Sequence, residues 1–344
     1  MRAVILASGR GTRFDPLTKY RPKPLLPAAN QPILRYLIQS LETVGFTDII
    51  ITLGYLAPQL ENFLSILPHT IHLTQIAAPN WSHGPLASFT SAIPHIKDDE
   101  PFVLLPADLY ISAKNLQSII DNATDECAIL YNPFQPRKGP VVQFDKDNHV
   151  TQFYISSTIE PTAKSSLPIL YATPQLFNMI RETKVNQVTT IFEILQLWIK
   201  SGHSLCAIPI ESETWFDVDF PSDLLDLNSH LIASAWPPTP TPLGEYIPPN
   251  TSIDEPLTDE NLTIGEETQV IGPVLLDSRV KIGNRCTIGP GTSLGTHTIV
   301  QDNTALVNCI TLPKTKVPPN AELRNTILDQ QGNAIHGTKQ NSHI

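Results

Sequence analysis

The chain has 344 residues, of which 41% are hydrophobic and 7% aromatic, so it can build a sizeable core and is not globally disordered. Its 33 acidic and 23 basic residues give a net charge of −10, which argues against general nucleic-acid binding because the phosphate backbone would be repelled. No apolar run reaches the roughly 18 residues of a membrane span, and Ala3–Leu6 is too short for a secretory signal. The cysteines Cys127, Cys206, Cys286 and Cys309 form no CxxC pair, so we expect reduced thiols in a cytoplasmic protein rather than a metal or disulfide framework.

Short apolar runs alternate with helical patterns from the first residue to about residue 230. The predicted strands are Ala3–Leu6, Asp48–Thr52, Ile71–Thr74 and Phe102–Leu105, and the predicted helices are Ile33–Val44 and Gln59–Leu67. Short apolar runs such as Phe102–Leu105, separated by helices, indicate parallel strands that are covered on both faces. The pattern therefore predicts a Rossmann-like, doubly wound, mostly parallel α/β domain with ligands at the carboxyl ends of its strands.

Aliphatic residues recur every six positions in the last part of the chain. The nine members of this series are Ile264, Val270, Leu276, Ile282, Ile288, Leu294, Val300, Leu306 and Leu312. Neither a helix nor an ordinary strand has a six-residue period. This period is typical of the hexapeptide repeat of a short left-handed parallel β-helix, in which the aliphatic side chains fill the interior.

These sequence patterns divide the chain into four parts. We expect an α/β domain over residues 1–232, a proline-rich linker over 233–260, the β-helix over 261–330 and a polar tail over 331–344. About three coils leave apolar faces poorly covered, so we expect the β-helix to pack on the first domain or to form a homo-oligomer.

A glycine-rich loop follows the first predicted strand. Gly9 and Gly11 can adopt positive φ and turn backbone N–H groups outward, which makes a nest for phosphate oxygens. Arg13 can donate a fork of hydrogen bonds to phosphate, and Lys23 can add a point charge. The loop has neither the Gly-Lys-Ser/Thr of a Walker A motif nor the third glycine of a dinucleotide fingerprint. It predicts a binding site for the phosphates of a nucleotide.

Asp108 is a candidate metal ligand. It follows the apolar strand Phe102–Leu105, so the strand would deliver one carboxylate to its carboxyl end. A hard oxygen at a fixed position suits a Mg²⁺ ligand, although a helix or turn cap would use an aspartate equally well.

These segments resemble the sugar-phosphate nucleotidyltransferases of the NDP-sugar pyrophosphorylase type. The family's opening signature, L-A-G/A-G-x-G-T-R-L-x-P-L-T followed by P-K-P-L, is matched over residues 6–25, with Ser8 and Phe14 as mild departures. The resemblance implies that Arg13 and Lys23 are the catalytic cations. It implies that the nucleotide is lined by Leu6, Ala7, Ser8, Gly9, Gly11 and Thr12.

The resemblance extends to the segment over residues 215–224. This segment is similar to the family's W-x-D-[IV]-[GD]-T-P-x-D-L, which implies that Asp217 joins Asp108 as a second Mg²⁺ ligand. Asp219 could assist that pair. We expect Asp223 to begin the following helix, as aspartates often do.

Weaker matches lie between these motifs. Gln75 and Gly84 occupy the family's base-binding region, where Pro85 departs from the common G-T-A, and Gly139 matches a glycine that lets the sugar approach the backbone. The family's Glu-Lys pair is missing after Val150, and Lys164 is a possible substitute for its lysine. The segment Asn80-Trp81-Ser82, together with Ser88, resembles a phosphocholine cytidylyltransferase branch.

The resemblance implies transfer of a nucleoside monophosphate from a triphosphate to a sugar 1-phosphate, with Mg²⁺ as cofactor, release of pyrophosphate and synthesis of an NDP-sugar. Two alternatives stay open: a phosphocholine-type cytidylyltransferase, and a non-catalytic relative that binds nucleotide as a regulatory or scaffolding subunit. A β-helix acyltransferase is a third hypothesis, which the small number of coils and the single candidate histidine, His297, disfavour.

Overall fold

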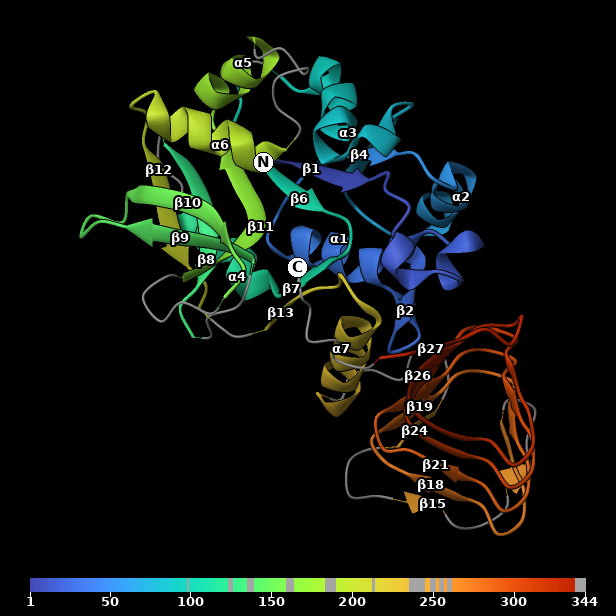
Figure 1. Ribbon diagram of the computed structural model, residues 1–344. Coiled ribbons are helices and arrows are strands. Elements are labelled where there is room, and N and C mark those ends of the chain that lie inside the picture. The colour runs from blue at the N-terminus through green and yellow to red at the C-terminus, as the bar shows by residue number, and fades with distance from the viewer. Residues whose placement is uncertain are drawn as a thin grey trace. The chain divides into compact units, whose positions relative to one another are not determined.

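The computed structural model describes residues 1–97, 99–122, 126–134, 139–158, 164–182, 190–211, 214–234, 245–247, 252–253, 257–258 and 262–337 (Figure 1). Contacts within the chain define two compact units. The first contains Met1–Arg10 and Leu34–Asp217, and the second contains Gly11–Ile33 and Val218–His343. Most of the predicted linker and residues 338–344 of the predicted tail lie outside the described residues. Among the helices described, none has both the length and the apolar character needed to cross a membrane.

The first unit is built on a sheet with strand order β10-β9-β11-β6-β1-β4-β5, extended by β8 on β11 and by β12 on β8. The strands of this sheet are β1 (Arg2–Ala7), β4 (Asp48–Leu53), β5 (His72–Ala77), β6 (Phe102–Pro106), β8 (Cys127–Asn132), β9 (Gly139–Phe144), β10 (Val150–Ser156), β11 (Lys164–Ala172) and β12 (Leu205–Pro209). A separate small sheet pairs β7 (Leu109–Ile111) with β13 (Trp215–Asp217). The helices are α1 (Ile33–Thr43, whose first residue belongs to the second unit), α2 (Ala57–Ile66), α3 (Pro85–Ala92), α4 (Ala113–Asp121), α5 (Pro174–Glu182) and α6 (Ile191–Lys200).

The run β6-β1-β4-β5 is parallel and has helices on both faces, as the apolar strands predict. Successive residues of a strand point to opposite faces. Val4 and Ile50 belong to one buried core with side chains of α3, α5 and α6, and Figure 1 shows these helices on one side of the sheet, with α1 on the other. The predicted elements of residues 3–105 are confirmed, with ends that differ by at most three residues.

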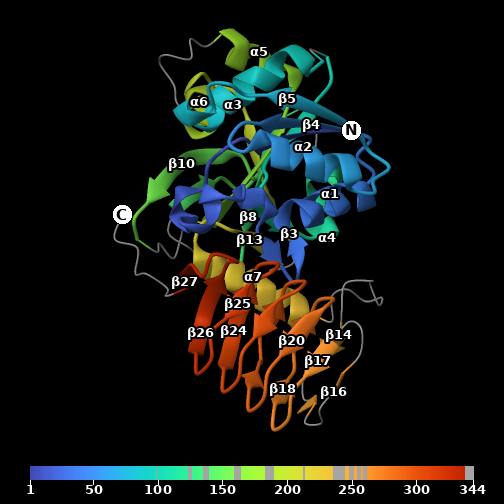
Figure 2. The same cartoon turned by 90° about the vertical axis from the view of Figure 1, so that its right-hand side faces the viewer.

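The second unit contains a parallel β-helix (Figure 2). Its strands are β17 (Leu262–Ile264), β18 (Gln269–Ile271), β19 (Val274–Leu276), β20 (Val280–Ile282), β21 (Thr287–Ile288), β22 (Thr292–Leu294), β23 (Ile299–Val300), β24 (Ala305–Thr311), β25 (Lys316–Val317) and β26 (Glu322–Leu328). The short strands β14 (Glu245–Ile247), β15 (Ser252–Ile253), β16 (Leu257–Thr258) and β27 (Ala334–His336) pair antiparallel with β19, β18, β17 and β26. The predicted β-helix is confirmed as parallel strands, and its left hand stays a prediction.

The hexad register holds for the first eight aliphatic residues and changes before the ninth. Ile264 pairs with Ile282 and Leu276 with Leu294, one full coil of three hexads apart. In the last coil Thr311, not Leu312, pairs with Leu294. The strict nine-residue register was therefore wrong at Leu312, because β24 turns the corner at Asn308 (φ 51°) in one continuous strand and shortens that coil by one residue.

Helix α7 (Pro221–Ala233) and the small hairpin of β2 (Pro27–Ala28) and β3 (Gln31–Pro32) belong to the same unit as the β-helix. Asn228 of α7 is fully buried and connects all three parts. Its Oδ1 accepts hydrogen bonds from the Ala29 N–H at 2.9 Å and the Ser293 hydroxyl at 2.7 Å, while its Nδ2 donates to the Gly291 carbonyl at 3.1 Å. One side chain therefore ties the hairpin and α7 to the β-helix.

We expect Asn228→Ala to destabilise the second unit by about 2–4 kcal/mol. Each buried group that loses its hydrogen-bond partner costs ~1–3 kcal/mol, and three partners are lost. Urea unfolding followed by circular dichroism measures the change. The matched control is Asp226→Asn, an exposed position on the same helix, where a change within about 0.5 kcal/mol is expected. Equal stability of the two variants would contradict the role given to Asn228.

Candidate active site

The first half of the glycine-rich loop is held at the carboxyl end of β1. The Tyr55 N–H donates to the Ser8 carbonyl at 2.9 Å, and the buried Ser8 hydroxyl shares a short hydrogen bond with the hydroxyl of Ser88 on α3. A Cβ at Gly54 would lie 2.7 Å from the Ser8 carbonyl oxygen and 2.6 Å from the Trp81 ring. Because this approach is too close for any side chain, glycine is needed at position 54 to let the loop pass.

Two aromatic side chains stand beside this loop. The Arg10 guanidinium carbon lies 5.7 Å from the centre of the Tyr55 ring, and the Tyr55 and Trp81 rings meet edge to face with centroids 5.7 Å apart. Sequence reasoning missed Gly54 and Tyr55. Their position immediately after β4, the strand paired with β1, could have indicated them, because ligands bind at the carboxyl ends of parallel strands.

Two carboxylates meet at the end of the neighbouring strand. Asp108 lies between β6 and β7, and the preceding Ala107 N–H donates to the Leu6 carbonyl at 3.1 Å. Asp217 ends β13 and pairs with Leu109 of β7, the residue next to Asp108. One carboxylate oxygen of each lies within 4.8 Å of the other. The structure therefore brings together the two acids that the sequence predicts as metal ligands, and hard oxygens at this separation suit a divalent cation.

The second half of the loop belongs to the second unit. Gly11 has a left-handed backbone (φ 68°), and its carbonyl accepts hydrogen bonds from the Phe14 N–H and the Thr18 hydroxyl. A Cβ at Gly11 would lie 2.8 Å from the Lys23 Cβ. The absence of a side chain at Gly11 thus allows the buried lysine to lie directly against the loop.

Asp219 is the partner of both predicted catalytic cations. Its Oδ1 lies 2.7 Å from Arg13 Nη1 and 3.5 Å from Lys23 Nζ. The Arg13 guanidinium also lies over the Phe220 ring, 4.9 Å from its centre. A triphosphate that binds Arg13 and Lys23 must compete with this carboxylate, a relation that the sequence does not predict.

Asp223 takes the helix-starting role that the sequence predicts. Its Oδ2 accepts hydrogen bonds from the N–H groups of Phe220 (2.7 Å) and Asp219 (3.0 Å) at the start of α7. Burial raises the pKa of the Asp223 carboxyl. This contact fixes the backbone that carries Asp219.

The weaker predicted site residues lie on three other elements of the first unit. Gln75 is exposed on the edge strand β5, Gly84 precedes α3 with φ 105°, and Gly139 begins β9, where it pairs with Ser156. Pro85 is the first residue of α3, where a proline is well tolerated. Thr12, in the second unit, begins a short 3₁₀ turn that also contains Arg13.

The chain is similar to known proteins over most of its length. A family model described as "Nucleotidyl transferase" matches residues 2–234, and one described as "GMPPB C-terminal domain" matches residues 270–338. A probable mannose-1-phosphate guanylyltransferase 3 of Oryza sativa subsp. japonica is 26% identical over 336 residues, covering 95% of this chain and 86% of that protein. A mannose-1-phosphate guanyltransferase of Aspergillus oryzae is 28% identical over 340 residues, with the same coverage.

Solved structures share the fold of about two thirds of the chain. A putative glucose-1-phosphate thymidylyltransferase from Bacillus anthracis superposes with a TM-score of 0.58 at 20% identity, covering 67% of this chain and 95% of that one. A UDP-glucose pyrophosphorylase from Acinetobacter baumanii gives 0.59 at 15% identity, covering 69% and 94%.

The matched region 2–234 contains the glycine-rich loop, both predicted cations and both carboxylates. Nucleotidyltransferases of this family generally use a divalent metal ion, for which Asp108 and Asp217 supply suitable oxygens. Because the family model covers more than half of the chain, this protein belongs to the nucleotidyl transferase family of enzymes.

Proposed function

We propose that the enzyme transfers a nucleoside monophosphate from a triphosphate to a sugar 1-phosphate and releases pyrophosphate, producing an NDP-sugar. The observation that supports this most is the pairing of Asp108 with Asp217, since these acids lie more than a hundred residues apart in the sequence and within 4.8 Å in the fold. The relatives named mannose-1-phosphate guanylyltransferase make GTP and mannose 1-phosphate the first substrate pair to test.

The chemistry is an in-line displacement at the α-phosphorus. An oxygen of the acceptor phosphate forms the new bond to phosphorus, and the bond from that phosphorus to the bridging oxygen of pyrophosphate breaks. The attacking oxygen is already an anion, so no strong general base is needed. The protein has to align two polyanions and neutralise their mutual repulsion.

Each group of the loop has a task in this scheme. Backbone N–H groups over Ser8–Thr12 bind phosphate oxygens. Arg13 and Lys23 leave Asp219 and stabilise the negative charge that grows on the departing pyrophosphate. Asp108 and Asp217 would hold Mg²⁺, a hard cation that carboxylate oxygens bind well. When bound, this ion lowers the charge repulsion between the two phosphate groups.

The sugar side of the site is proposed from β9 and β11. Gly139 would let the sugar approach the backbone, and Lys164, the first residue of β11, pairs with Val142 three residues further along β9. We propose that Lys164 takes the place of the lysine missing after Val150. Gln75 and Gly84 would contact the base of the nucleotide.

The β-helix is proposed as an assembly domain. We propose that the chain forms a homo-oligomer through the β-helix. The proposed domain boundaries are residues 232 and 261, and the proposed location is the cytoplasm. Light scattering of the purified protein measures the oligomer, and a monomer would count against assembly.

We expect Asp108→Asn and Asp217→Asn each to lower kcat by at least ~10²-fold, because each removes a charged group of the metal pair. Pyrophosphate release measures the rate. The control is Asp99→Asn, which removes an exposed aspartate in the same unit and should leave the rate unchanged. Activity within tenfold of wild type for either variant would remove that residue from the metal pair.

Lys23→Met is expected to lower kcat by at least ~10²-fold, because one cation is lost from the departing pyrophosphate. Lys19→Met is the matched control, since Lys19 is exposed in the same loop region. Single-turnover measurements separate the chemical step from binding. If the two variants lose activity equally, the effect is due to net charge and not to the position of Lys23.

The substrate assignment is tested with four or five triphosphates against several sugar 1-phosphates and phosphocholine. We expect turnover with a sugar 1-phosphate, and GTP with mannose 1-phosphate as the best pair. Addition of a chelator should stop the reaction, and Mg²⁺ should restore it. Turnover only with CTP and phosphocholine would replace the sugar with a choline-type acceptor, and nucleotide binding without any pyrophosphate release would contradict catalysis.

A further inference from the structure

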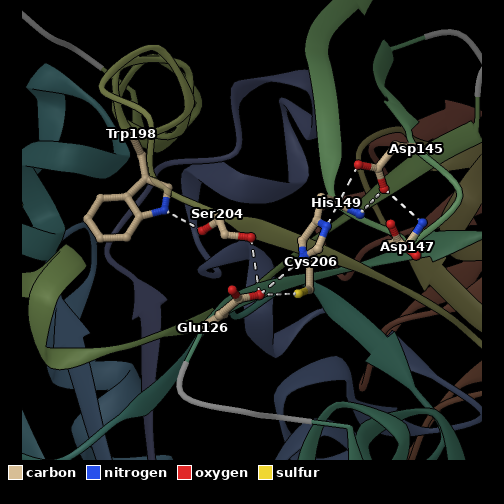
Figure 3. Close-up of polar contacts among 7 residues, drawn as sticks. All are labelled: Glu126, Asp145, Asp147, His149, Trp198, Ser204 and Cys206. Carbon is tan, nitrogen blue, oxygen red and sulfur yellow. Dashed lines mark hydrogen bonds and ion pairs between the residues drawn. The ribbon is translucent and has the colours of Figure 1, made fainter.

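Three potential metal ligands of different chemistry converge within the first unit, beside strands β8 and β12 and the turn between β9 and β10. Glu126 immediately precedes β8, Cys206 is the second residue of β12, and His149 ends the turn between β9 and β10. Strands β8 and β12 are paired, and His149 forms an isolated bridge with Cys206. Figure 3 shows the three side chains pointing toward one another. We call them the Glu-His-Cys cluster.

The ligand atoms of this cluster are close enough for one ion to bind all three. The Cys206 thiol lies 2.9 Å from Glu126 Oε2, and His149 Nε2 lies 3.5 Å from the same oxygen. All three ligand atoms lie within 4.8 Å of one another. Tetrahedral zinc with bonds of ~2.0–2.3 Å places its ligand atoms about 3.4–3.6 Å apart, so only small side-chain rotations are needed.

Surrounding groups hold the ligands in place. The other ring nitrogen of His149, Nδ1, faces Asp145 Oδ2 at 3.7 Å, which is the carboxylate–histidine arrangement that supports metal-bound imidazoles. Asp145 also accepts hydrogen bonds from the N–H groups of Asp147 and His149, so it fixes the turn that carries His149. The Ser204 hydroxyl donates to Glu126 Oε2 at 3.1 Å, and the Trp198 indole N–H fixes Ser204 through its carbonyl (Figure 3).

The charge of this region favours a cation. Glu126, Asp145 and Asp147 are acidic, and Lys146 is the basic residue of the turn between β9 and β10.

We propose that the Glu-His-Cys cluster is a zinc site with Glu126, His149 and Cys206 as protein ligands and water as the fourth. A thiolate, an imidazole and one carboxylate suit zinc, whereas Mg²⁺ requires oxygen ligands. The ion would join the β9–β10 turn to the paired strands β8 and β12, adding to the His149–Cys206 bridge and to the hydrogen bond from the Ala207 N–H to the Asn148 carbonyl. Zinc therefore stabilises this side of the sheet.

The test measures binding of Zn²⁺ to the purified full-length protein by competition with a chromogenic chelator. Excess Mg²⁺ keeps the Asp108–Asp217 pair from taking up zinc. We expect one tight zinc per chain, and a higher melting temperature when it binds. Cys206→Ser and His149→Gln should each lower the affinity by more than the ~10–100-fold that loss of a supporting group costs, and Asp145→Asn should lower it within that range.

Co²⁺ provides an independent readout of the cysteine ligand. With Co²⁺ the wild type should show a sulfur-to-cobalt charge-transfer band in the near ultraviolet, which Cys206→Ser abolishes. The matched control is His72→Gln, an exposed histidine of the same unit, which should retain wild-type affinity. His149→Gln lies in a surface turn, so it tests the proposal even if Cys206→Ser does not fold. Equal zinc affinity of wild type and His149→Gln, or the absence of the cobalt band, would overturn the proposal.

Discussion

The parallel pairing of β1 with both β4 and β6 is the constraint on which the first half of the candidate site depends. In this register Ala7 is paired with Leu53, and Leu6 with Pro106. The three segments that follow these residues therefore leave the sheet at the same edge. They supply the glycine-rich loop, the aromatic Tyr55 and the carboxylate of Asp108. A one-residue slip would turn each strand's buried side chains to the other face and disrupt both cores.

The second unit organises the cations in a different way. Arg13 and Lys23 are held by a carboxylate of the same unit, Asp219, whose backbone is fixed by Asp223 at the start of α7. That helix is tied to the β2–β3 hairpin and to the β-helix by Asn228. The β-helix is thus linked through α7 to the backbone that carries Asp219, the partner of Arg13 and Lys23.

Much of the fold follows from local patterns. The central residues of β1 and β4 are apolar because both faces of these strands are covered. The six-residue period of the β-helix reflects side chains stacked in one interior. The register change at Leu312 could not be predicted, because it depends on how β24 turns a corner and not on composition.

The candidate site was predictable where a compact motif carries it. The glycine-rich loop with Arg13 and Lys23 is one continuous stretch, and Asp108 follows an obvious strand. The contact of Asp219 with both cations depends on tertiary structure. The same holds for Glu126, His149 and Cys206, whose spacing matches no ligand motif because three separate strands bring them together.

In the proposed mechanism Asp108 and Asp217 act as one unit on a single cation during nucleotidyl transfer. The most direct test compares kcat of the double variant Asp108→Asn/Asp217→Asn with that of each single variant. If the two residues act together, the double variant is only a few-fold slower than the worse single variant, because either loss alone disables the pair. If the two fold-losses in kcat multiply, Asp108 and Asp217 act independently and do not form one metal-binding pair.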